Sequence, residues 1–151
     1  MNQLLDQFLH YLIVEKGLSR NTIEAYSHSL NRFFDHLIGK GIQEISEVSR
    51  MDVRAFLLAL AKRGLTIRTV VRNLVAIRTF FQFLVQEGIL TVNPIEELES
   101  PKIAKTLPEI LTLKEIEHLL EQPNTQTPLG IRDRAMLEML YATGMRVSEL
   151  T

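Results

Sequence analysis

The stretch from Thr66 to Gly88 reads TIRTVVRNLVAIRTFFQFLVQEG and decides the fold. Its apolar residues return every three or four positions, which is the spacing of one face of an α-helix. They are Ile67, Val70, Val71, Leu74, Ile77, Phe80, Phe81, Leu84 and Val85. Thr66 is a suitable cap for the start of this helix, and Gly88 is a suitable end. The stretch therefore predicts a long amphipathic helix that buries one stripe of side chains.

Three earlier stretches show the same helical spacing. Their apolar positions run from Leu5 to Ile13, from Ile23 to Ile38 and from Val53 to Leu60. Glycines separate the stretches, and Ser19 or Asn21, and later Ser49, stand where helix caps are favoured. No stretch alternates as a strand does, and we detect no internal repeat. The sequence therefore predicts an all-α fold that begins with a compact bundle of about four to five helices.

A proline-containing segment follows this bundle, with prolines at positions 94, 101 and 108. It has no regular apolar spacing, although Asn93-Pro94 resembles the cap and first residue of a short helix. We therefore expect three parts in the chain. Residues 1–91 form the helical domain, residues 92–110 form a linker between domains, and residues 111–151 form the N-terminal fragment of a second domain.

The second domain is expected to open with two helices. Thr112 and Glu115 match a capping box for the first, and the second should run from about Leu129 to Tyr141. The side chains that it should bury are Ile131, Ala135, Met136, Leu137, Met139 and Leu140. The chain then turns at Gly144 and begins a new helix at Arg146. Because two helices and a stub enclose no core, we expect a truncated domain with uncovered apolar faces.

The overall composition is that of an ordinary globular protein, with 151 residues, a formal net charge of −1 and no cysteine. The lack of cysteine excludes disulfides and thiolate metal sites, and the four histidines show no metal-ligand spacing. The N-terminus lacks the basic stretch of a signal peptide, and no apolar run is long enough for a bilayer. We therefore expect a cytoplasmic protein without a metal site.

The near-neutral total hides two blocks of opposite charge. Between positions 50 and 78, seven basic residues face the single acid Asp52; they are Arg50, Arg54, Lys62, Arg63, Arg68, Arg72 and Arg78. Between positions 91 and 121, seven glutamates face three lysines. Local charge decides what a surface attracts, so the basic block indicates a site for polyanions.

The polar face of the helix after Thr66 lies within the basic block. Its members are Arg68, Thr69, Arg72, Asn73 and Arg78, and the helix after Ser19 adds Arg20, Asn21 and Thr22. Arginine and threonine bind phosphates or guanine edges, and asparagine pairs with adenine, so these residues are candidates for binding a DNA groove. The alternative is a solvated face without a ligand, as for most surface arginines.

The last ten residues before Thr151 read YATGMRVSEL, residues 141–150. Arg146 follows a glycine turn and opens a helix, where a phosphate would meet several donors at once. Glu149 is placed to orient its guanidinium. The alternative is a surface ion pair between the two residues, worth less than about 1 kcal/mol.

These motifs resemble the tyrosine site-specific recombinases, also called the phage integrase family, and in particular their Xer branch. The segment around Arg146 is similar to the family's first arginine motif, and Arg132-Asp133 precedes it at a matching place. The second helix, the linker and the start of the second domain resemble the family at Gly17–Thr22, Asn93-Pro94, Pro101-Lys102, Leu107-Pro108 and Leu111-Thr112. The resemblance covers the whole chain.

The resemblance implies a fold and a reaction. An N-terminal SAM-like core-binding domain and a catalytic domain would close around duplex DNA, with a second recombinase subunit and a tetramer on the DNA. Strands would be cut and rejoined through a 3′-phosphotyrosine intermediate, without metal or nucleotide cofactor, in chromosome dimer resolution. Arg146 would be a catalytic residue and Glu149 would support it. The matching nucleophilic tyrosine is absent from the 151 residues, so this chain is expected to bind duplex DNA without cleaving it.

Two alternatives remain open from the sequence. Within the family, the chain could come from a phage or transposon integrase. Outside it, the chain could be a non-catalytic helical DNA-binding or adaptor protein in which Arg146 has only a structural role.

Overall fold

The computed structural model describes residues 1–101 and 110–150, and its described secondary structure is entirely helical, as predicted. The chain divides into two compact units, Met1–Ala104 and Lys105–Thr151. The motifs expected at Lys102 and Leu107-Pro108 lie outside the described residues. None of the described helices has the length and apolar content that a bilayer crossing needs.

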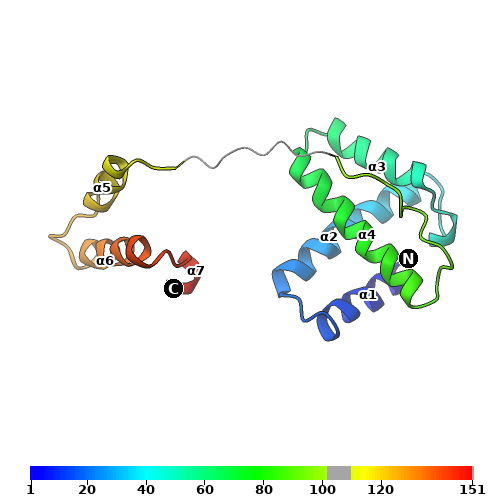
Figure 1. Cartoon of the computed structure of the whole chain (residues 1–151), viewed down its shortest axis with the longest axis horizontal. Helices are drawn as coiled ribbons and strands as arrows, with labels where there is room; N and C mark the ends of the chain where they lie inside the picture. Colours follow the sequence, from blue (N-terminus) through cyan, green and yellow to red (C-terminus); the bar gives the residue numbers. More distant parts are fainter. Residues whose placement is uncertain (102–109, 151) are drawn as a thin grey trace. The chain divides into compact units, whose positions relative to one another are not determined.

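The first unit contains four long helices (Figure 1). They are α1 (Asn2–Val14), α2 (Arg20–Gly39), α3 (Arg50–Lys62) and α4 (Ile67–Gln86), with a short 3₁₀ helix, η1 (Ile45–Glu47), between α2 and α3. Their apolar stripes meet in one core, in which Phe80 of α4 packs edge-on against Phe8 of α1 and Phe34 of α2. The predicted bundle is confirmed.

Hydroxyl caps set where these helices begin. Ser19 and Thr66 accept hydrogen bonds from the backbone N–H groups of Thr22 and Thr69, which satisfies donors that the first turn leaves free. Ser49 forms a reciprocal capping box with Asp52. Its hydroxyl donates to the Asp52 carboxylate over 2.6 Å, and this hydrogen bond is the main reason that the pKa of Asp52 lies below its ordinary value.

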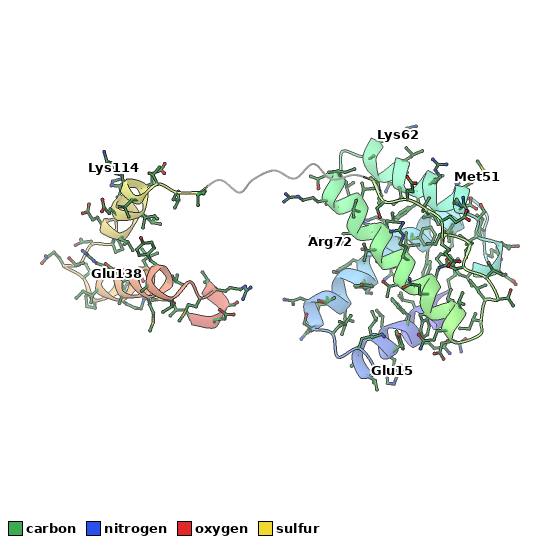
Figure 2. All side chains as sticks on the ribbon, viewed as in Figure 1. Glu15, Met51, Lys62, Arg72, Lys114 and Glu138 are labelled. Carbon is green, nitrogen blue, oxygen red and sulfur yellow. The ribbon has the colours of Figure 1, made fainter. Side chains whose placement is uncertain are left out.

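Contrary to our sequence analysis, the bundle contains an internal repeat, formed by residues 2–39 and 50–86. In both halves a helix of 13 residues leads into one of 20 residues. Buried side chains correspond in order, as Phe8 with Phe56, Leu12 with Leu60, Phe33 with Phe80, Phe34 with Phe81, and Leu37 with Leu84. The turns also match, because Gly17 and Gly64 both have a left-handed backbone and both precede a leucine and a hydroxyl cap. Figure 2 labels Glu15 and Lys62, which stand at the ends of α1 and α3.

The segment after α4 belongs to the first unit, although we expected the linker to begin at residue 92. Ile95 and Leu98 are buried in the bundle core, so the packed unit extends beyond α4. Asn93 does not start a helix; its side-chain oxygen accepts the N–H of Ile95 and stabilises a turn. Ile95 and Leu98 stand directly before and after the pair Glu96-Glu97, and this spacing was not regular enough to be recognised as core.

The second unit holds α5 (Leu113–Glu121), α6 (Pro128–Thr143) and the short α7 (Val147–Leu150). The capping box of Thr112 and Glu115 is confirmed, and the hydrogen bond from the Thr112 N–H lowers the pKa of the Glu115 carboxyl. The burial expected for α6 is wrong, because Ile131 and Met139 are more than half exposed. In the described part of this unit, only the short helices α5 and α7 are available to cover α6.

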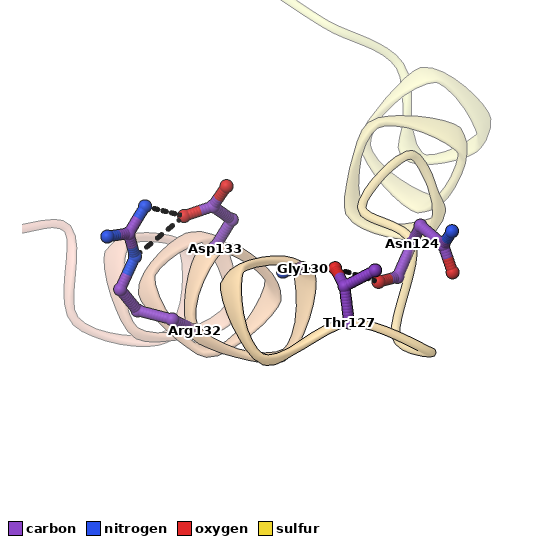
Figure 3. Close-up of polar contacts among 5 residues, drawn as sticks. All are labelled: Asn124, Thr127, Gly130, Arg132 and Asp133. Carbon is purple, nitrogen blue, oxygen red and sulfur yellow. Dashed lines mark hydrogen bonds and ion pairs between the residues drawn. The ribbon is translucent and has the colours of Figure 1, made fainter.

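The corner between α5 and α6 is built around Gly130, the buried residue of α6 (Figure 3). Thr127 caps α6 by accepting the Gly130 N–H, and its hydroxyl donates to the carbonyl oxygen of Asn124. The backbone of Asn124 lies so close to Gly130 that a Cβ there would overlap it. Along α6, Arg132 donates two hydrogen bonds to the carboxylate of its neighbour Asp133.

Candidate nucleic-acid interface

The first half of α2 and the middle of α4 border a shallow groove of about 340 Å³. Its lining residues are Asn21, Thr22, Ala25, Tyr26, Ser29, Arg72, Val75 and Ala76. Beside it, the hydroxyl of Tyr26 on α2 lies 3.5 Å from that of Thr79 on α4. Three sequence-predicted residues, Asn21, Thr22 and Arg72, are therefore brought together from distant parts of the chain.

The polar side of the groove on α2 is positioned by the Ser19 cap. The hydroxyls of Ser19 and Thr22 lie 2.9 Å apart, which fixes the Thr22 side chain in the first turn. Asn21 beside it is exposed. Arg20 is also exposed, and its Nε donates to the Glu24 carboxylate over 2.8 Å. A phosphate that bound Arg20 would compete with this carboxylate. Of Arg20, Asn21 and Thr22, we therefore expect Arg20 to make the weakest contact with DNA.

The polar side on α4 repeats this arrangement. The hydroxyls of Thr66 and Thr69 lie 3.0 Å apart, and Arg68 and Arg72 are exposed one turn from each other. Arg72 projects from the middle of α4 (Figure 2), and no carboxylate among the described residues pairs with it. We call the predicted residues on these two helices the α2–α4 face; they are Arg20, Asn21, Thr22, Arg68, Thr69 and Arg72.

Two residues that were predicted to bind DNA do not belong to this face in the structure. Asn73 is not on the exposed side of α4, since only 3% of it is accessible. Its amide donates to the Thr69 carbonyl oxygen over 2.8 Å, and its own side-chain oxygen is buried without a hydrogen-bond partner among the described residues. Arg78 is half-buried and donates to the Leu98 carbonyl oxygen and to the Ser100 hydroxyl. Its guanidinium is therefore occupied by the segment that follows α4.

The floor of the groove was missed by the sequence analysis. Ala25, Ser29 and Ala76 are small residues, and Ser29 and Ala76 hold corresponding places in the two halves of the repeat. Small side chains at matching positions allow two helices to approach closely. This spacing is the signal that could have located the groove.

Arg146 lies between the end of α6 and the start of α7. Gly144 ends α6 with a left-handed backbone (φ 67°), and the Arg146 N–H donates to Glu149 over 2.8 Å. The Arg146 guanidinium also contacts Glu149, at 3.1 Å, while its side chain is 82% exposed. Glu149 is thus in contact with the arginine that it was expected to orient, and the guanidinium remains open to solvent. Among the described residues, no group of three or more His, Asp or Glu side chains could hold a metal ion.

Comparisons with known proteins find matches over both units of the chain. The model of the phage integrase N-terminal SAM-like domain matches residues 5–88, and that of the phage integrase family matches residues 109–151. Tyrosine recombinase XerC of Herpetosiphon aurantiacus is 47% identical over 99% of this chain. Tyrosine recombinase XerD of Listeria monocytogenes serotype 4b is 43% identical over 99% of it, and that of Listeria innocua 44%.

The first match assigns the N-terminal unit to the class of SAM-like helical domains. This match covers more than half of the chain. The chain belongs to the phage integrase family, the tyrosine recombinases, and Xer recombinases are among its relatives. It spans about half the length of the curated relatives it matches, 51% of the Listeria monocytogenes protein and 49% of the Herpetosiphon protein.

Proposed function

We propose that this chain grips duplex DNA through the α2–α4 face, as the DNA-binding part of a site-specific recombinase. The observation that carries the proposal is the groove that brings Asn21, Thr22 and Arg72 together. Arginine supplies charge for phosphates and a planar donor pair for guanine, while asparagine and threonine supply neutral donors and acceptors for base edges. Because Arg72 has no carboxylate partner among the described residues, it can bind an anion without first breaking an ion pair.

The proposed reaction cuts and rejoins DNA strands through a 3′-phosphotyrosine intermediate. Arg146 would donate two parallel hydrogen bonds to the non-bridging oxygens of the scissile phosphate, on which charge accumulates in the transition state. Glu149 would orient the guanidinium through the contact already described. The names of the relatives support this reaction, since they are called tyrosine recombinases.

The partners follow from the same proposal. Duplex DNA would be held between two domains, with a second recombinase subunit completing a tetramer, and the protein would act in the cytoplasm. Chromosome dimer resolution is the proposed role, because the relatives carry both Xer names. A phage or transposon integrase would use the same face and the same arginine.

The experiment that tests DNA binding is a fluorescence anisotropy titration of a labelled mixed-sequence duplex at several salt concentrations. About five neutralised phosphates predict a log–log slope of affinity against salt of about −4.5. Arg72→Gln should make the slope shallower by about 0.9. Arg50→Gln is the control, because the Arg50 guanidinium already lies 2.7 Å from the Glu97 carboxylate. A chain that binds no duplex, or binds it without salt dependence, would contradict the proposal.

A further inference from the structure

The two halves of the internal repeat share a fold but carry opposite charge. Residues 2–39 contain three basic residues and four acidic ones, whereas residues 50–86 contain seven basic residues and one acidic residue. Both halves bury the same pattern of apolar side chains, so this difference is not needed to form the core. A surface charge that the fold does not require points to a ligand, and a polyanion is the ligand that suits the second half.

The difference is sharpest at the turn that joins the two helices of each half. In the second half, Lys62 ends α3 and Arg63 follows it, before Gly64 turns the chain into α4. In the first half, the corresponding turn holds Glu15 and Lys16. The Lys16 ammonium lies 5.4 Å from the centre of the Tyr11 ring, so it is held against an aromatic face.

Lys62 and Arg63 are exposed, and no carboxylate among the described residues pairs with either. Several other basic residues of the bundle are paired, as Arg20 is with Glu24 and Lys40 is with Asp52. Two cations at consecutive positions raise the local positive potential, which attracts an anion. Their placement in a turn fixed by Gly64 and by the Thr66 cap also limits the backbone ordering that binding would cost.

We infer that Lys62 and Arg63, here called the α3–α4 corner, bind phosphates of the same duplex that the α2–α4 face grips. The inference rests on the proposed function and adds contacts outside the groove. The corner leads directly into the first turns of α4, which carry Arg68 and Arg72, so these basic residues follow one another closely along the chain. Its contacts go to the phosphate backbone, so they strengthen binding equally on all sequences.

The test is the salt dependence of duplex binding by the whole chain and five variants. Lys62→Gln and Arg63→Gln should each make the log–log slope shallower by about 0.9, and the double variant by about 1.8. Lys62→Arg keeps the charge and should keep the slope. Lys16→Gln removes one charge from the corresponding turn of the first half and should also keep it. Circular dichroism melts of each variant check that the bundle is folded.

The outcomes separate this inference from the proposed function. If the wild-type chain binds with the expected salt dependence and the double variant has the same slope, the corner does not bind phosphates. The inference is also wrong if Lys16→Gln lowers the slope as much as Lys62→Gln, because the effect would then be one of total charge. If the wild-type chain binds no duplex, the proposed function fails first.

Discussion

Arg78 on α4 donates a hydrogen bond of 2.7 Å to the hydroxyl of Ser100, and its second terminal nitrogen donates to the Leu98 carbonyl oxygen. Near the start of α3, Arg50 lies 2.7 Å from Glu97 of the same segment. Two basic residues of the sequence-defined basic block therefore hold the chain that follows α4. Part of the basic block therefore anchors this segment, and the binding of an anionic ligand is proposed for the remainder of the block.

Arg78→Ala should lower the free energy of unfolding of the first unit by about 1–3 kcal/mol, because the Leu98 carbonyl loses a charged donor. Denaturant unfolding measures this change. The salt slope of DNA binding should stay as in the wild-type chain. If Arg78→Ala instead weakened binding as much as Arg72→Gln and left stability unchanged, the anchoring role would be wrong.

His36 should make the bundle less stable as the pH falls below about 6.5, its ordinary pKa. Burial, chiefly, and then the charges of Lys40 and Arg63 lower the pKa of His36 in the folded chain, while Asp52 opposes the shift. Its Nε2 is buried and has no hydrogen-bond partner in the part of the chain that the structure describes, and its ring packs against Phe56. Above pH 6.5 the ring is neutral whether the chain is folded or not. Below it, the unfolded chain takes up the proton more readily, so stability falls until the pH passes the folded pKa.

Denaturant unfolding at a series of pH values on both sides of 6.5 measures this effect. His36→Leu should reduce the loss of stability below that value. Asp52 adds a separate loss in stronger acid, because its stabilising contribution is present above about 3.8 and disappears as the pH falls through its lowered pKa. An unchanged profile between pH 6.5 and 3.8 in His36→Leu would show that the ring does not carry this dependence.

The caps and helix bounds were predictable because they depend on residues close in sequence. Ser49, Thr66 and the Thr112–Glu115 box stand where expected. Asn73 was assigned to the exposed face of α4 because asparagine is polar. Its spacing indicated the buried face, since it lies three residues after the buried Val70 and four before the buried Ile77. The groove was missed because it depends on α2 packing against α4, and the small residues at matching positions of the two helices were its only trace in the sequence. The contacts of Arg78 depend in the same way on how a later segment folds back.

Gly130→Ala should destabilise the α5–α6 corner by about 1–3 kcal/mol, the usual cost of forcing atoms into a packed place. The new Cβ would overlap the Asn124 backbone, which cannot move as a side-chain end can. Amide hydrogen exchange of α5 and α6 measures the local opening. Gly39→Ala is the matched control, because a Cβ there meets no atom within 4 Å. Equal protection in both variants would mean that the close approach is not needed.

Arg146→Ala should abolish strand cleavage in a recombinase that carries this segment, while duplex binding changes little. The loss reflects a guanidinium that stabilises the transition state more than the bound substrate. Arg146→Lys should restore little activity, because an ammonium cannot donate the two parallel hydrogen bonds. A cleavage assay on a nicked suicide duplex measures both variants. Normal cleavage by Arg146→Ala would remove this residue from the site.

The most direct measurement of DNA binding by the α2–α4 face is the change in backbone amide NMR shifts when a duplex is added to the chain. If the α2–α4 face binds DNA, we expect the largest shifts at residues 20–22 on α2 and 68–72 on α4, with small shifts at Asn2–Val14 of α1. They should fade as salt is added, in parallel with the binding affinity. Largest shifts on α1, or no shifts at low salt, would contradict the account.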